Sequence, residues 1–233
     1  MSTQKSTAFN AVKLFMNLIM GLSLITVVLV GIKYAVNDQK DKQILELQKA
    51  VLEMRATVAV DAVRQFNIQK IITIMDQYNT VMPRQKKYEI AEEIYNVTLR
   101  YPNLNVDLLC ATITHESAGT WNPSIKSPAG AIGLMQIMPA TGMFIAAQEG
   151  IVWTSAQEIL TDPIYNIRIG ARYLSSLIEL YDVDGGLAAY NGGEMRAALW
   201  LETGKKSGIL AKETQHYIPA IQRLYKEYAS YTM

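Results

Sequence analysis

An uncharged apolar run near the start of the chain places the strongest limit on what this sequence can fold into. Residues 14–32 form 19 residues without a charge, bracketed by Lys13 and Lys33. A helix of about 20 apolar residues is long enough to cross a bilayer. A run that is apolar on every side also has no polar face to turn towards water. We therefore expect residues 14–32 to form an uncleaved transmembrane anchor, preceded by a short N-terminal tail, residues 1–13.

Two other interpretations of this run remain open. A cleaved signal peptide usually has a shorter apolar core, and no A-x-A-like cleavage site follows Ile32. A buried core helix is the second alternative, but this run is apolar all round and lies near the N-terminus. Lysines flank the run on both sides, so the positive-inside rule does not orient it. The tail is too short to be a domain, and the bulk of the chain therefore follows the anchor.

Composition excludes several kinds of partner and site. The 233 residues carry a net charge of +1, only 18% are charged, and no long basic run is present, so we expect no nucleic-acid partner. The lone cysteine, Cys110, cannot form an intramolecular disulfide and is expected to be a small buried apolar residue. His115 and His216 lie far apart without further ligands at metal-site spacing. We predict no metal and no cofactor.

A helix is expected to follow the anchor over residues 37–78. Its apolar residues first keep the a and d spacing of a heptad, which Asp61 then interrupts: Ile44, Leu47, Val51, Met54 and Val58. A second group continues the helix on a shifted stripe: Ile68, Ile71, Ile72 and Met75. About two heptads are too few to predict a coiled coil. We interpret residues 37–82 as a helical linker or stalk, either free or packed on the main domain.

The remaining chain, residues 83–233, is expected to be one mainly helical domain. Pro83 and the sequence Thr161-Asp162-Pro163 begin helices, and Pro102 ends one. Helices are also expected over residues 141–150 and 211–228, with a turn at residues 184–186 and an interruption at Gly192-Gly193. No alternating run is long enough for more than an incidental strand. The predicted fold class is therefore mainly α.

A helix that begins near Asp107 carries the first candidate catalytic residue. Asn105 is a favourable N-cap and Gly119 a common helix end. One face is apolar until it reaches Glu116, through residues at i, i+3, i+4 and i+7: Leu109, Thr112, Ile113 and Glu116. Burial and the nearby helix carbonyls both raise the pKa of such a carboxyl group. A protonated carboxyl near neutral pH suits a general acid in glycoside cleavage; the alternative is a helix-terminal surface residue.

The segment after this helix is expected to be a long loop over residues 122–133. It contains the turn-forming residues Pro123, Pro128, Gly130 and Gly133. A second helix is expected to begin near Leu134 and to be kinked or ended by Pro139. The loop bears Ser127 and is followed by Gln136. Folded back against Glu116, it would form the wall of a cleft.

Four segments in this order resemble a known family. Glu116-Ser117 is followed by SPAGAIGLMQIMP at residues 127–139, AYNGG at residues 189–193 and ETQHYI at residues 213–218. Together they resemble the signature of lytic transglycosylases, the goose-lysozyme-like glycoside hydrolase family 23. The resemblance covers about residues 90–228 and implies a lysozyme-like helical domain. Several short blocks in the right order are far more specific than any one of them.

The resemblance implies a reaction and a set of site residues. Glu116 would protonate the glycosidic oxygen between N-acetylmuramic acid and N-acetylglucosamine, then act as base on the muramic C6 hydroxyl, giving a 1,6-anhydro end without water. The substrate's acetamido group would assist. Ser127, Gln136 and Met138 would line a sugar subsite, Tyr190 and Asn191 the opposite wall, and Tyr217 would lie near the acid. Met138 and Tyr217 as plain core residues, and Ser127 as a loop cap, are the structural alternatives.

Other functions remain to be separated from this one. A muramidase would cleave the same bond with water and usually needs a second carboxylate, but the next acidic residue after Glu116 is Glu149. The third hypothesis is a non-catalytic wall-binding assembly module. The presence of Glu116, Gln136 and Asn191 argues against it. The expected partners are peptidoglycan glycan strands and a membrane. Such a chain suits the bacterial inner membrane with its catalytic domain in the periplasm, a secretion or conjugation system, or a phage virion.

Overall fold

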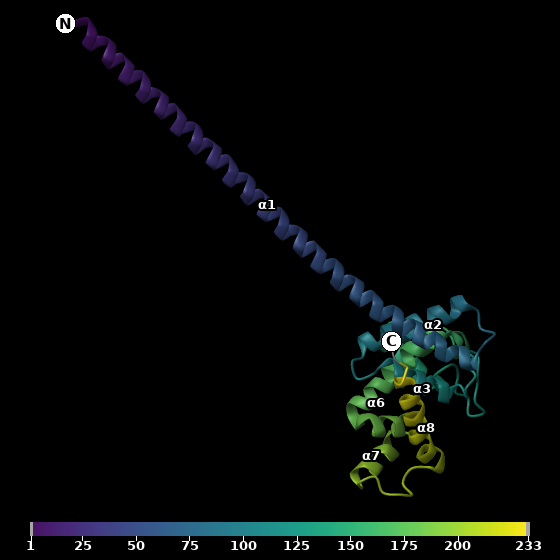
Figure 1. Ribbon diagram of the computed structural model, residues 1–233. Coiled ribbons are helices and arrows are strands. Elements are labelled where there is room, and N and C mark those ends of the chain that lie inside the picture. Colours follow the sequence, from purple (N-terminus) through teal and green to yellow (C-terminus); the bar gives the residue numbers. More distant parts are fainter. Residues whose placement is uncertain (1, 232–233) are drawn as a thin grey trace. The chain divides into compact units, whose positions relative to one another are not determined.

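The computed structural model describes residues 2–231, which form helices joined by turns and loops (Figure 1). The helices are α1 Ser2–Tyr78, α2 Arg84–Arg100, α3 Val106–Glu116, α4 Pro139–Gln148, α5 Ala156–Thr161, α6 Pro163–Gly192, α7 Glu194–Glu202 and α8 Lys212–Ala229. Within these residues there is no strand, and β-type pairing is limited to isolated bridges of Ile132 with Lys126 and Ile137. The mainly α fold class is confirmed.

The chain divides into two units, Met1–Asp61 and Ala62–Met233. The first unit is part of helix α1, and its side chains from Lys13 onward are exposed. By length and composition this helix is apolar enough to cross a membrane, a test that a signal sequence also passes. The expected tail, residues 1–13, is helical from Ser2, whereas residue 1 and the side chains before Lys13 lie outside the described part.

The last turns of α1 belong to the core of the second unit. Their shifted apolar stripe is almost completely buried, at no more than 3% exposure: Ile68, Ile71, Ile72, Ile74 and Met75. The Lys70 Nζ lies 2.7 Å from Asp107 Oδ1 on α3, and Arg64 pairs with Glu92 on α2. The compact unit therefore begins at Ala62, earlier than the Pro83 boundary expected for the catalytic domain. The change of stripe at Asp61 marks where α1 changes from exposed to packed.

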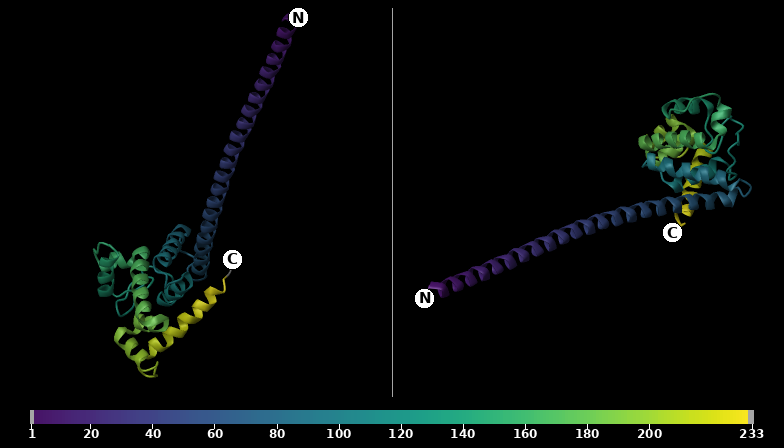
Figure 2. Two further views of the ribbon diagram at one scale, coloured as in Figure 1. Left: turned by 90° about the vertical axis from the view of Figure 1, so that its left-hand side faces the viewer. Right: turned by 90° about the horizontal axis from the view of Figure 1, so that it is seen from above.

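In the second unit (Figure 2), helix α3 packs against α2 and α8, while α6 packs against α2, α7 and α8. Asn105 caps α3 as expected, because its Oδ1 accepts a hydrogen bond from Leu108 N at 2.9 Å. The α3 side chains Leu109, Cys110 and Ile113 have no exposed surface, so Cys110 is the buried apolar residue that the sequence indicated. This packing fixes the end of α3, where Glu116 lies.

Two local expectations were wrong. No helix begins near Leu134; Gln136 N donates to Gly133 O in a turn, and Pro139 instead opens α4, since a proline at the first helical position loses no hydrogen bond. The turn expected at residues 184–186 is also absent. Helix α6 breaks at Asp182, with φ 58°, and continues through both glycines. A Cβ on Gly186 would lie 2.7 Å from Ile178 Cγ1, so this glycine permits close packing.

Candidate active site

Glu116 ends α3 with its carboxyl group only partly exposed. The hydroxyl of Tyr217 on α8 donates a hydrogen bond to Glu116 Oε1 at 2.6 Å. Burial raises the pKa of Glu116 from 4.5 to about 7; the hydrogen bond from Tyr217 opposes this rise, and the charge of Glu213 adds to it. The carboxyl group is therefore able to hold a proton near neutral pH and to release it to a bound group.

Tyr217 is completely enclosed between the acid and the core. Burial and the nearby charge of Glu116 hold the pKa of Tyr217 well above its usual value. The phenol therefore remains a proton-bearing hydrogen-bond donor. The ring of His115 packs edge-on against the Tyr217 ring, with centroids 4.8 Å apart. Tyr217 is both a core residue, as the alternative interpretation had it, and a direct partner of Glu116.

A buried polar cluster holds the turn that follows Glu116. Ser117 Oγ accepts from Trp121 N at 3.1 Å, and Trp121 Nε1 donates to Thr114 Oγ1 at 3.0 Å. Tyr228 on α8 donates to the same Thr114 oxygen at 3.0 Å. These bonds fix the direction of the chain as it leaves α3. Sequence reasoning missed Thr114, Trp121 and Tyr228, because only their meeting in space gives them this role.

Ser127 and Gln136 build the loop between α3 and α4. Ser127 Oγ accepts from Ala131 N at 3.0 Å, so its hydroxyl caps the loop. Gln136 adopts a positive φ of 47°, and its Nε2 donates to Gly133 O at 2.9 Å. The described contacts of Ser127 stay within the loop. Met138, whose side chain is exposed, lies at the start of α4 and its carbonyl accepts from Gly142 N.

Asn166 on α6 clamps this loop to the core. The fully buried amide accepts from Met135 N at 2.8 Å and donates to Ile132 O and Leu160 O, both at 2.9 Å. Gly133 is required here, since a Cβ at this residue would lie 2.2 Å from the Asn166 Nδ2. Tyr190 OH donates to Met135 O at 2.8 Å, so the Met135 residue is held from both sides. The sequence did contain a signal for this role of Asn166. It lies four residues before Gly170 and eight before Leu174, and is therefore a polar residue on the buried face of α6.

Tyr190 and Asn191 lie in the last turn of α6. Burial raises the pKa of Tyr190, and so does the charge of Glu116, which places the two groups within electrostatic range. The Tyr190 ring also contacts the Tyr173 ring, at 5.4 Å between centroids. Asn191 Nδ2 lies 3.5 Å from Glu213 Oε1, and its Oδ1 is buried with no hydrogen-bond partner among the described residues. A donor from a ligand could reach this oxygen only if the Asn191 side chain or its surroundings moved.

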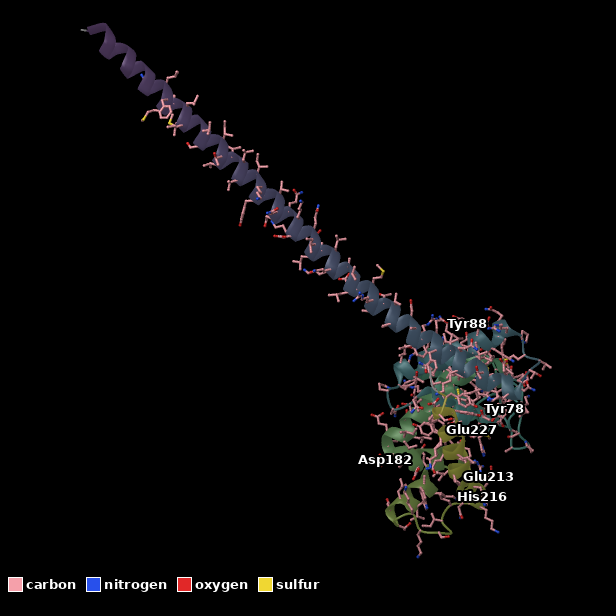
Figure 3. All side chains as sticks on the ribbon, in the orientation of Figure 1. Tyr78, Tyr88, Asp182, Glu213, His216 and Glu227 are labelled. Carbon is pink, nitrogen blue, oxygen red and sulfur yellow. The ribbon has the colours of Figure 1, made fainter. Side chains whose placement is uncertain are left out.

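Glu213 is the second carboxyl group of the site. It lies in the first turn of α8, is exposed, and is labelled in Figure 3. The sequence showed no acidic partner close to Glu116 along the chain, and this one is brought in by folding. Across the described residues no group of three or more metal-ligating side chains gathers. The site therefore offers one proton-holding carboxyl group, one exposed carboxylate, tyrosine hydroxyls and amides.

Residues 94–212 match the family model described as "Transglycosylase SLT domain". The chain belongs to this family. The motif resemblance is therefore confirmed. A solved lytic transglycosylase Slt from Pseudomonas aeruginosa, an inactive mutant, superimposes with a TM-score of 0.51 at 27% identity, covering 59% of this chain and 23% of that chain. A complex of the 70-kDa soluble lytic transglycosylase with bulgecin A gives a TM-score of 0.50 at 29% identity, over 63% and 26% of the two chains.

Curated relatives of the SLT-domain chain come from cells and from a phage. Soluble lytic murein transglycosylase of Escherichia coli is 42% identical over 93 residues, covering 39% of this chain and 14% of that protein. The transglycosylase of Enterobacteria phage PRD1 is 36% identical over 111 residues, covering 47% and 37%. The endo-type membrane-bound lytic murein transglycosylase A of Klebsiella pneumoniae is 41% identical over 71 residues, covering 30% and 34%. The chain thus spans well under half the length of each.

Proposed function

We propose that this protein is a membrane-anchored lytic transglycosylase that cleaves the β-1,4 bond between N-acetylmuramic acid and N-acetylglucosamine in peptidoglycan. The observation that carries the proposal is Glu116, a carboxyl group with a pKa of about 7 that is hydrogen-bonded by Tyr217 at the end of a core helix. The names of the relatives, which act on murein, supply the substrate class. Family membership alone would leave the acid unassigned.

In the first step, protonated Glu116 gives its proton to the glycosidic oxygen as the bond from that oxygen to the muramic C1 breaks. The positive charge that develops at C1 is met by the carbonyl oxygen of the substrate's own acetamido group. The new Glu116 carboxylate is stabilised by the Tyr217 hydroxyl, which already points at Oε1. This hydrogen bond is stronger to the charged form, so it assists proton release.

In the second step, the Glu116 carboxylate takes the proton of the muramic C6 hydroxyl while O6 bonds to C1 and displaces the acetamido oxygen. Glu116 is protonated again, no water is consumed, and the product end is a 1,6-anhydro ring. Ser127, Gln136 and Met138 would line one side of the sugar subsite, and Tyr190 and Asn191 the other. The Asn191 side chain, which is partly exposed, would contact the sugar, and a turn of its amide group would bring the unpartnered Oδ1 to a sugar hydroxyl.

One observation favours a second candidate, a muramidase. Glu213 lies close enough for its charge to raise the pKa of Glu116, and it is exposed to solvent. An inverting hydrolase uses such a second carboxylate to activate water. Glu213 also contacts Asn191, which offers it a positioning role in the transglycosylase reaction instead. The two reactions give different products from the same bond.

Product mass decides between these reactions. The full-length chain in detergent is incubated with purified peptidoglycan, and the released fragments are weighed by mass spectrometry. We expect ends that are one water lighter than reducing ends, and none from Glu116→Gln. Reducing ends from the wild-type chain would establish a muramidase. If the wild type and Glu116→Gln release equally little, the chain is a non-catalytic wall-binding module.

The anchor is tested separately from the chemistry. We propose that residues 14–32 hold the chain in the bacterial inner membrane, with the unit from Ala62 on the periplasmic side, where peptidoglycan lies; a virion location is the alternative that the phage relative supports. Deleting residues 1–32 removes no proposed site residue and none of the packed turns of α1. The deleted form should be soluble and still digest wall. A soluble but inactive form would show that the anchor segment is part of the fold.

A further inference from the structure

Helix α1 carries an apolar seam between its anchor candidate and its packed end. The seam consists of five residues in the first unit, which are between 43% and 66% exposed: Ile44, Leu47, Val51, Met54 and Val58. A shallow groove lies along it, lined by Ile44, Leu47, Val51 and their neighbours Gln48, Leu52 and Arg55. So much exposed apolar surface on one face is costly in water, at about 25 cal/mol per Å². We therefore expect another molecule to cover the seam.

A membrane is a poor occupant for this seam. A charged segment, from Asp38 to Lys42, separates it from the apolar run, and Lys42 pairs with Asp38 at 2.8 Å. The face opposite the seam alternates acidic and basic residues, with Glu46, Lys49 and Glu53 at i, i+3 and i+7. Helices that lie on membranes usually carry a lysine- and arginine-rich polar face instead. The side of the helix opposite the seam thus carries a charged row, beside the exposed apolar residues Leu45 and Leu52.

The residue types of the seam indicate another helix of the same kind. With Ile44 at position a, all three a residues are β-branched, and both d residues are unbranched at Cβ: Ile44, Val51 and Val58 against Leu47 and Met54. This distribution favours parallel two-stranded coiled coils over larger assemblies. The neighbouring e and g positions over residues 43–57 hold only one charge, Arg55. No like charges would therefore face each other along the seam.

Charged residues end the seam at both its N-terminal and its C-terminal end. The next d positions outward are Lys40 and Asp61, neither of which belongs in an apolar interface. At the first end Asp41 occupies position e, next to Lys40, so in a parallel pair these opposite charges of two copies would meet. At the other end Asp61 is the last residue of the first unit. The apolar register thus stops where the packed part of the chain begins.

We propose that two copies of this chain pair through residues 44–58 as a short parallel coiled coil. Two heptads alone would be marginal, but this helix is continuous over Ser2–Tyr78, so pairing does not have to nucleate it. The parallel orientation rests on the proposed anchor, since both copies would enter one membrane through residues 14–32. Sharing a membrane also raises the effective concentration of the second copy.

Disulfide cross-linking tests the pairing in membranes that contain the full-length chain. The native Cys110 is fully buried, and burial raises the pKa of its thiol, so it is silent to mild oxidation. Ile44→Cys and Val58→Cys, each expressed alone, should form covalent dimers. The control is Lys49→Cys at position f on the opposite face, which we expect to cross-link at least about tenfold less. In a parallel pair each seam residue faces the same residue of the second copy, so both cysteine variants must form disulfide-linked homodimers.

Each other outcome overturns the proposal. Cross-links only between mixed Ile44→Cys and Val58→Cys chains would mean an antiparallel pair, and a covalent product of different mass would mean another protein. Equal linking at Lys49→Cys would mean random collision. As a second readout, Val51→Glu should convert detergent-solubilised dimers to monomers while Lys49→Glu does not. Wall digestion and membrane fractionation of the same samples report on the proposed function, so a failure of that function is seen separately from a failure to pair.

Discussion

Two largely enclosed carboxyl groups in the second unit, Glu149 and Glu116, have opposite surroundings. The Glu149 side chain is 3% exposed, with Arg100 Nη1 at 2.7 Å, Arg172 Nη1 at 3.4 Å and the Tyr101 hydroxyl at 2.5 Å. Glu116 has a tyrosine hydroxyl as well, but its described contacts include no cation. Where guanidinium groups compensate burial, a carboxylate holds the fold together. Where they are lacking, burial makes the group a proton donor.

The same difference has opposite consequences for stability. At Glu149 the charged form is matched by two cations, so removing it leaves those cations without their partner. At Glu116 the charged form is disfavoured in the folded state, so ionisation at higher pH favours unfolding. A catalytic group such as Glu116 lowers the stability of the folded state, whereas a structural group such as Glu149 raises it. The comparison can therefore be tested through both activity and unfolding.

The largest expected effect is on activity at Glu116. Glu116→Gln keeps the size and the Tyr217 contact but cannot give a proton, so digestion of purified wall should fall at least about 100-fold, the usual worth of general acid catalysis. The measurement is the initial rate of fragment release, with circular dichroism to confirm the fold. Glu227→Gln, an exposed change on α8, is the matched control and should leave the rate unaltered (Figure 3). A retained rate in Glu116→Gln would place the acid elsewhere.

The next effect is on stability at Glu149. Glu149→Ala should lower the free energy of unfolding by about 2 kcal/mol, less than the 3–5 kcal/mol of a fully buried pair, because the Arg100 side chain is 55% exposed. Chemical denaturation at pH 7 measures this change, and the digestion rate of the folded fraction should stay close to wild type. If the unfolding midpoint did not move, Glu149 would not be the structural counterpart of Glu116.

A smaller stability effect of the opposite sign is expected at Glu116. The folded pKa of about 7 lies above the ordinary 4.5, so between these values the unfolded chain loses its proton first and wild-type stability falls as pH rises. Glu116→Gln removes this penalty. It should raise the free energy of unfolding by about 1 to 2 kcal/mol at pH 8, after allowance for partial exposure, and change it little at pH 4. A gain of equal size at both values would point to a cause other than ionisation.

The smallest effects concern the pH profile of digestion. Wild-type activity should decline on the alkaline side as Glu116 loses its proton near pH 7. Tyr217→Phe removes a hydrogen bond that lowers the pKa of Glu116, so the decline should move to higher pH. Glu213→Gln removes a negative charge that raises this pKa, so the decline should move to lower pH. Rate profiles from pH 5 to 9 measure both, and shifts in the same direction would contradict the assigned surroundings.

Local chemistry was readable from the sequence to a useful extent. The cap at Asn105, the apolar face that leads to Glu116 and the proline after Asp162 each act through neighbours along the chain, and each appears in the structure. The pKa direction at Glu116 was also predictable, because burial and helix-end position are local properties. Leu134 was misjudged because Pro139 was interpreted as a helix end, although proline is equally favourable at a helix start.

Features set by distant contacts were not readable. The stripe of Ile68 and Met75 gave no hint whether it faced water, a second helix or the core, because any of these fits the same period. Asn166 resembled an ordinary polar position until its amide was found between Met135 and Leu160. Glu213 is far from Glu116 in sequence and meets the site only because α8 packs on α3. The turn-like sequence at residues 184–186 concealed a helix that breaks earlier, at Asp182, and packs closely through Gly185 and Gly186.

Two tyrosines, Tyr228 in the last turn of α8 and Tyr231 just after it, determine which part of the chain must be made before the second unit can fold. The Tyr228 and Tyr78 hydroxyls are hydrogen-bonded to each other at 2.9 Å, and Gln77 Nε2 donates to Tyr231 OH at 2.8 Å, so the end of α1 closes against the end of α8. Synthesis proceeds from the N-terminus, and the core cannot close before α8 has left the ribosome. On the proposed topology the apolar run inserts first, and the second unit crosses the membrane as an unfolded chain. It becomes able to cut wall only after export.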